Sequence, residues 1–93
     1  MPISVIVPNA LTPYTRGVGT LVLEERCTTV AEALAAVAAR LPALTDRVLT
    51  EQGEVRRHVN IFVGEESIKF LDGLSTPVDA HSTITIVPAV SGG

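Results

Sequence analysis

The fold is decided by the stretch Thr29–Pro42, whose sequence is TVAEALAAVAARLP. Thr29 and Glu32 form a capping box, because each side chain is placed to accept a backbone N–H that the first helical turn leaves without a partner. Apolar residues then recur at intervals of four, three and four, at Val30, Leu34, Val37 and Leu41. This spacing predicts a helix with one apolar face. Pro42 disfavours helical geometry at the preceding residue, so the helix ends or kinks there.

Short runs rich in β-branched residues lie on both sides of this helix and predict strands. The runs are Ile3–Val7 and Thr20–Glu24 before the helix, and Val59–Val63, Ser67–Phe70 and Thr83–Val87 after it. We expect Ser67–Phe70 to be a short edge strand, a position that suits Lys69. Packing one main helix against one face of a mixed sheet of four or five strands is the economical way to bury the apolar stripe. The sequence therefore predicts an α+β chain with the β-grasp fold over residues 1–88.

The composition narrows the classes of protein that fit. The chain has 93 residues, 46% of them apolar, which allows one modest core and is too apolar for a disordered segment. No apolar run approaches the roughly 18 residues of a membrane span, and the N-terminus has no secretory signal pattern. The single cysteine, Cys27, has no partner for an internal disulfide, so we expect a cytoplasmic setting. A net charge of −3, scattered basic residues and few aromatics argue against nucleic-acid binding.

The chain continues past Pro88 as Ala89–Gly93, in which every residue but Val90 is small. We expect residues 89–93 to form a flexible tail that reaches about 17 Å beyond the fold, at ~3.3–3.6 Å per extended residue. Gly92 and Gly93 lack Cβ, so such a tail fits a narrow channel in a partner. Adenylation of the terminal carboxylate by ATP would then give a mixed anhydride that sulfur can attack. A terminal Gly-Gly alone is a weak pattern, but here it directly follows a compact strand.

Three segments carry a family resemblance. They are Val59–Val63, Ile68–Phe70 followed by Gly73, Leu74 and Thr76, and above all Ile86–Gly93. In these segments the sequence resembles the ubiquitin-like small sulfur carriers, which include the thiamine and molybdopterin sulfur carriers. The resemblance extends over nearly the whole chain, although the first half matches mainly in pattern. It is strongest with the branch that serves a protein-bound route to cysteine.

The resemblance implies a ubiquitin-like β-grasp fold and a carrier that binds no cofactor or metal and is not itself an enzyme. An E1-like adenylating partner would use ATP to activate Gly93, and a sulfur source would convert the adenylate to a thiocarboxylate. A cysteine synthase-like enzyme would accept the sulfur, and a metalloprotease would later free the amino acid. Two departures from the family pattern are the turn Asp79-Ala80-His81, where Asp-Gly-Asp is frequent, and Ser91, where Ala is common.

The candidate reactive residues are therefore Gly93 and Gly92, with a partner-binding surface around them. The residues assigned to that surface are Phe62, Phe70, Pro88, Ala89, Val90 and Ser91. If Val59, Ile61 and Val63 face the helix, alternation directs Phe62 to the opposite face of the sheet. A position in the core is equally compatible with the pattern for both phenylalanines.

Other residues that suggest chemistry have simpler interpretations. A lone cysteine such as Cys27, near a strand-to-helix junction, is more often a small buried hydrophobe than a nucleophile. His58 and His81 lack the neighbouring thiols or carboxylates of a metal site. The cluster Arg56-Arg57-His58 is either a small docking patch for an acidic partner or the solvated rim of a strand.

Three alternatives to the sulfur carrier remain open. The chain could be a ubiquitin-like modifier that joins Gly93 to lysines, since that reaction begins with the same adenylate. It could also be the small subunit of molybdopterin synthase, whose tail inserts into the large subunit. The third alternative is an inert β-grasp interaction domain.

Overall fold

The computed structural model describes residues 2–88, so the predicted tail, 89–93, lies outside the described part of the chain. The strands and α-helices are β1 (Ile3–Ile6), β2 (Thr20–Leu23), α1 (Val30–Arg40), α2 (Pro42–Val48), β3 (Val59–Val63), β4 (Glu66–Ser67) and β5 (Thr83–Pro88). Three 3-10 helices are η1 (Asn9–Thr15), η2 (Ile68–Phe70) and η3 (Gly73–Ser75). No helix within residues 2–88 has both the length and the apolar character needed to cross a bilayer.

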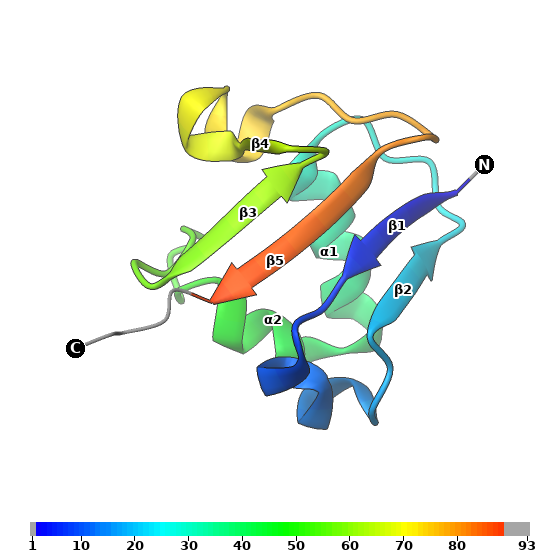
Figure 1. The fold of residues 1–93 in the computed structure, drawn as a ribbon, viewed down its shortest axis with the longest axis vertical. Coiled ribbons are helices and arrows are strands. Elements are labelled where there is room, and N and C mark those ends of the chain that lie inside the picture. Colours follow the sequence, from blue (N-terminus) through cyan, green and yellow to red (C-terminus); the bar gives the residue numbers. More distant parts are fainter. Residues whose placement is uncertain (1, 89–93) are drawn as a thin grey trace.

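The five strands form one mixed sheet in the order β2-β1-β5-β3-β4. β1 and β5 are parallel neighbours at its centre, and the other pairs are antiparallel. Figure 1 shows both α-helices on one face of the sheet, with α1 crossing behind the central strands. The chain thus adopts the predicted β-grasp fold, with the last strand inserted beside the first.

Residue alternation along the strands places the core between the sheet and α1. In β1, Ile3 and Val5 are buried, and Val7 just beyond the strand is buried on the same side. Ile6 points the other way and is exposed. The helix contributes its predicted stripe, and the buried members of both layers are Ile3, Val5, Val7, Leu23, Val30, Ala33, Leu34, Val37, Val59, Ile61, Ile84 and Ile86. The apolar periodicities of 2 and 3.6 therefore meet in one core.

Two side chains, those of Thr29 and Glu32, cap the start of α1, with one difference from the predicted capping box. The hydroxyl of Thr29 accepts the backbone N–H of Glu32 at 3.2 Å, as expected. The Glu32 carboxylate does not accept the Thr29 N–H; it accepts the backbone N–H of Thr28 at 2.7 Å and the Thr28 hydroxyl at 2.9 Å. These hydrogen bonds stabilise the ionised carboxylate and lower the pKa of Glu32.

Pro42 ends α1 as predicted, and it also begins a second helix, α2, beyond the predicted one. Leu41 leaves helical geometry with φ −135° and ψ 67°, and Pro42 occupies the first turn of α2. Proline is favoured there because its missing N–H would have no helical partner. Leu44 and Val48 of α2 are buried and extend the core beyond α1.

The prediction of a strand over Ser67–Phe70 is wrong beyond Ser67. β4 ends at Ser67, and Ile68–Phe70 form η2, whose first turn is capped by the Ser67 hydroxyl accepting the Lys69 N–H at 3.2 Å. In a strand, Ile68 and Phe70 would share one face. The turn instead buries Ile68 in the core and leaves Phe70 85% exposed. Burial of one isoleucine thus outweighs the β propensity of this segment.

Candidate functional site

The last strand carries the chain to one end of the sheet. β5 is hydrogen-bonded on both sides, to β1 and to β3, and Ile84 and Ile86 anchor it in the core. The strand extends one residue further than predicted, since Pro88 lies opposite Val59, the first residue of β3. Figure 1 shows β5 ending beside the start of β3 and near α2. The candidate residues Ala89, Val90, Ser91, Gly92 and Gly93 follow this point and lie outside the described residues.

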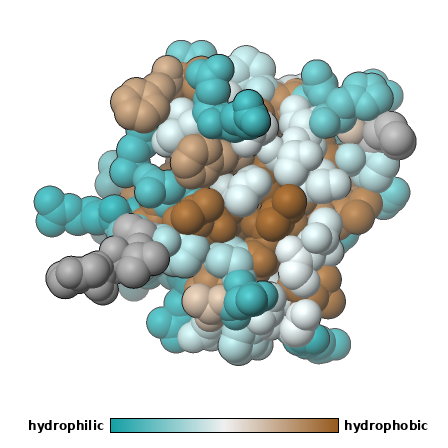
Figure 2. Space-filling view, in the orientation of Figure 1, coloured by the Kyte–Doolittle hydropathy of each residue, from teal (hydrophilic) through white to brown (hydrophobic). Residues whose placement is uncertain are grey.

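The face of the sheet opposite the helices carries a band of apolar side chains. Phe62, directly opposite Thr85, is half-buried on this face, and Val87 and Ile6 are exposed on it. Figure 2 shows hydrophobic residues gathered across the middle of this face, over the central strands. Phe62 therefore lies on the outer face, one of the two placements that the sequence allowed.

Phe70 is not part of that strand surface, and the structure separates it from Pro88. β4 pairs with the last residues of β3, whereas Pro88 pairs with the first. η2 follows β4, so Phe70 and Pro88 lie toward opposite ends of β3. At 85% exposure, Phe70 does not occupy the core. It is a large apolar side chain presented to solvent at the edge of the sheet.

A polar pocket of about 350 Å³ lies at the end of the molecule where β5 finishes. It is lined by Tyr14, Ala43, Asp46, Arg47, Arg56 and His58, and we call this set the basic pocket. Backbone hydrogen bonds connect it to α2 and to the start of β3: Arg56 N–H donates to the carbonyl of Val48 at 2.9 Å, and Val59 N–H donates to the carbonyl of Arg56 at 3.0 Å. Val59 in turn lies opposite Pro88, the last residue of β5. The sequence indicated Arg56, Arg57 and His58 as one docking option but gave no signal for Tyr14 or Arg47.

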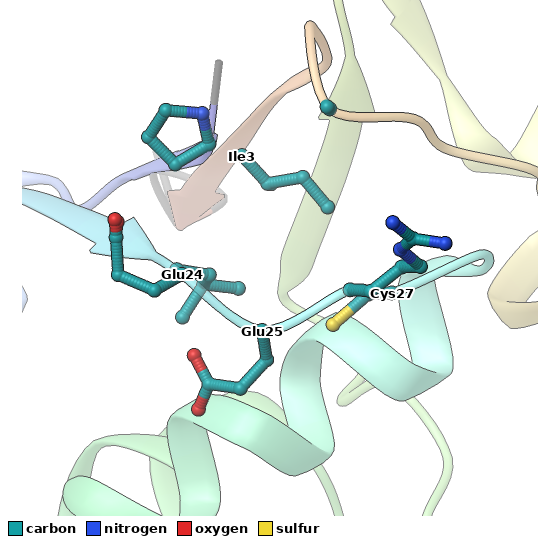
Figure 3. Close-up of a pocket in the computed structure, with 8 residues that line it drawn as sticks. Ile3, Glu24, Glu25 and Cys27 are labelled. Carbon is teal, nitrogen blue, oxygen red and sulfur yellow. The ribbon is translucent and has the colours of Figure 1, made fainter.

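Cys27 has the properties of a buried thiol. It lies between β2 and α1 and is 7% exposed, beside a separate cavity of about 300 Å³ at the end of the sheet where β5 begins. Figure 3 shows its sulfur directed toward α1. Burial raises the pKa of the Cys27 thiol, and the nearby charges of Glu25 and Glu32 raise it further. The neutral thiol is therefore favoured, which confirms Cys27 as a small buried hydrophobe.

The turn before β5 is ordered by its own side chains despite the unusual sequence Asp79-Ala80-His81. The Asp79 carboxylate accepts the backbone N–H of His81 at 2.7 Å, and the Ser82 hydroxyl accepts the Asp79 N–H at 2.9 Å. Asp79 thus forms an Asx-type turn without glycine. Within residues 2–88, no group of three His, Cys, Asp or Glu side chains is arranged to hold a metal ion.

Comparison with known proteins identifies the class of protein that this fold and this strand end define. Residues 5–93 match the model of the ThiS family, and the chain belongs to that family. The sulfur carrier protein CysO of Mycobacterium tuberculosis is 31% identical over 99 aligned residues, which cover all of both chains. Small archaeal modifier protein 3 of Haloferax volcanii is 34% identical over 65 residues, 70% of each chain.

Solved structures agree. The chain superposes on a chain of the BexX/CysO complex of Amycolatopsis orientalis with a TM-score of 0.87, at 32% identity, covering 98% of this chain and 99% of that one. The family match and the similarity to the sulfur carrier CysO over the full length of both chains confirm the prediction of a sulfur carrier protein with the ubiquitin-like fold.

Proposed function

We propose that this sulfur carrier works through the carboxyl group of Gly93, which alternates between a carboxylate and a thiocarboxylate. The observation that supports this most directly is the end of β5. The strand is anchored in the core through Ile86, ends at Pro88 at the rim of the sheet and is followed by five residues up to Gly93. Five extended residues span about 17 Å, at ~3.3–3.6 Å each, which is enough to reach a reaction centre in another protein.

The chemistry has two steps. An E1-like enzyme transfers AMP from ATP to the Gly93 carboxylate, and pyrophosphate leaves. Sulfide then attacks the acyl carbon, the bond to the phosphate oxygen breaks and AMP leaves. The sulfide gives up its proton to solvent, and the C-terminus is a thiocarboxylate. ATP is bound by the partner, and the carrier itself holds no cofactor. The carrier contributes a positioned acyl group.

We further propose that the thiocarboxylate donates its sulfur for cysteine formation. A cysteine synthase-like enzyme would accept the tail, and a metalloprotease would release the product from it. The similarity to CysO over the full length of both chains supports this branch. The surface that meets these enzymes is the outer face around Phe62, together with Pro88 at the end of the strand and residues 89–91 that follow it. Phe70 would be a separate contact toward the other end of β3.

Intact-mass measurement tests the central step. The purified chain is incubated with ATP, an E1-like enzyme and sulfide, and a control omits ATP. We expect a mass gain equal to the replacement of one oxygen by one sulfur, located on Gly93 by fragmentation. An unchanged mass in the complete reaction, when a known carrier is converted under the same conditions, would refute the proposal.

One observation supports a second function, protein modification. Small archaeal modifier protein 3 is 34% identical over 65 residues, and conjugation would begin with the same Gly93 adenylate. Digestion of cell proteins followed by mass spectrometry separates the two functions. Remnants of this tail on lysine side chains, lost when Gly93 is deleted, would establish conjugation; thiocarboxylate without such remnants would leave the carrier function alone.

A further inference from the structure

The two ends of the sheet differ in charge. At the end where β5 begins, the exposed acidic residues follow β2, lie at the turn into β4 or precede β5: Glu24, Glu25, Glu65, Glu66 and Asp79. Arg26 and Lys69 are exposed at the same end, and Glu25 is paired with Arg40, so acidic charge is in excess there but not unopposed. At the end where β5 finishes, Arg47, Arg56 and Arg57 lie in or beside the basic pocket. Asp46 also lines the pocket, and Glu51 and Glu54 are exposed in the adjoining turn, so the positive charge is local rather than general.

Neutral groups hold the two arginines of the basic pocket in place. The Nε of Arg56 donates to the backbone carbonyl of Asp46 at 2.9 Å. The guanidinium of Arg47 lies over the ring of Tyr14, 4.7 Å from its centroid, in a cation–π contact. The ion pair found within residues 2–88 joins Arg40 to Glu25, and neither pocket arginine has a described carboxylate within ion-pair distance. Both charges are thus positioned without being neutralised.

This arrangement suits the recognition of a carboxylate. A guanidinium presents a planar fork of donors to a carboxylate, and the prior contacts of Arg47 and Arg56 reduce the side-chain entropy lost when a new ion pair forms. The pocket is about 350 Å³ and is lined mainly by polar side chains of η1, α2 and the segment before β3. It is therefore large enough for an Asp or Glu side chain inserted from another protein.

We propose that the basic pocket receives an acidic side chain of the enzyme that activates the tail. The inference rests on the proposed function, because that enzyme must face the end of the sheet where β5 finishes. Docking at Arg47 and Arg56 fixes the orientation of the body while residues 89–93 enter the partner. The carboxylates at the opposite end would be repelled by the same acidic surface, so the charge distribution orients the carrier tail-first.

Binding of the carrier to an E1-like enzyme, measured by isothermal titration without ATP or sulfide, tests this inference. Arg47→Glu and Arg56→Glu should each weaken binding about tenfold at low salt, with a smaller loss near 0.5 M salt where exposed charges are screened. Arg26→Glu is the matched control, because it makes the same charge change on an exposed residue at the other end of the sheet. It should change the affinity less than about twofold. Circular dichroism verifies that each variant is folded, and Arg47→Gln replaces any variant that is not.

Three results would overturn the inference: equal losses at Arg26 and Arg47, unchanged binding in both pocket variants, or no binding of the unaltered carrier. Saturation of the pocket by inorganic phosphate or ATP alone, followed through the NMR signals of His58 and Arg56, would also overturn it, since the occupant would then be a small anion. The experiment is independent of sulfur chemistry. A carrier that binds through Arg47 yet gains no sulfur would contradict the proposed function and leave the pocket's role intact.

Discussion

The two rows of side chains along β5 have different environments, although they alternate on one strand. Ile84 and Ile86 face α1 and are 0% and 1% exposed. Thr83, Thr85 and Val87 face the other way, where Val87 is 37% exposed. The first row is held by the helix layer. The second row belongs to a face that no described element covers (Figures 1 and 2).

This difference separates stability from function. The covered face contains nearly all the apolar burial that stabilises the fold. The open face and the end of the strand contribute little to the core and are accessible to partners. Under the proposed function the carrier enters several enzymes in turn, and this division would let its contact surface change without repacking its interior.

The strongest test of this separation of stability from function changes the end of the chain. Deletion of Gly93, or addition of one alanine after it, moves the carboxyl group by about 3.3–3.6 Å along the tail. We expect the rate of thiocarboxylate formation to fall at least about 100-fold, as reacting groups lose their alignment in the partner. Intact-mass time courses measure the rate, and thermal unfolding should give the same midpoint for all three chains. Equal conversion of the extended chain, with its added residue still present, would contradict the separation.

A matched pair of substitutions tests the two faces directly. Val5→Ala removes a side chain that is 0% exposed under α1, and it should lower the free energy of unfolding by about 2–3 kcal/mol. Val87→Ala makes the same change on the open face and should cost less than about 1 kcal/mol. Urea unfolding followed by circular dichroism measures both. Similar losses would mean that the open face also belongs to the core.

The covered face was also the more predictable one. Thr29, Pro42 and the apolar spacing between them defined α1 locally. Alternation along Val59–Val63 separated the two sides of that strand, and Val59 and Ile61 are the buried side. These signals depend on neighbours in sequence, so a single chain is enough to detect them.

What the sequence did not predict depends on contacts between distant segments. α2 is a helix of seven residues, too short for a clear apolar period. The turn at Ile68 follows from burial of that side chain in a core built by other elements. In the basic pocket, Arg47 stacks on Tyr14 because η1 packs against α2, and no local pattern relates these two residues.

A smaller effect is expected from Phe70, which tests whether the edge of the open face binds partners. Phe70→Ser should leave the free energy of unfolding within about 0.5 kcal/mol, since the ring is 85% exposed. Phe70 lies toward the other end of β3 from Pro88, so its substitution should weaken binding to the sulfur-accepting enzyme about tenfold if the ring is a contact residue there. Lys69→Ser is the control on the neighbouring exposed position. Equal affinity of both variants and the unaltered chain would remove Phe70 from the partner surface.

The smallest effect is expected from the charge of Glu32, which lies at the start of α1 in the helix layer. The Glu32 carboxylate is ionised more readily than usual because the Thr28 N–H and hydroxyl donate to it, so its pKa in the folded chain lies below the ordinary value of 4.5. A lowered pKa stabilises the fold above the unfolded-state pKa, and this contribution is lost as the pH falls through the folded-state value. Glu32→Gln should therefore be less stable than the unaltered chain at pH 7, and the difference should shrink below about pH 4.5. Unfolding free energies measured across this pH range give the difference between the two chains. Glu66→Gln is the control, because Glu66 is exposed and its side chain makes no described hydrogen bond. A difference that grew on acidification would mean that the carboxylate is disfavoured in the folded chain, contrary to its two short hydrogen bonds. The effect on the free energy of unfolding should be modest, because Glu32 is exposed and water weakens the electrostatic contribution. In the helix layer stability therefore comes mainly from apolar burial and only slightly from charge.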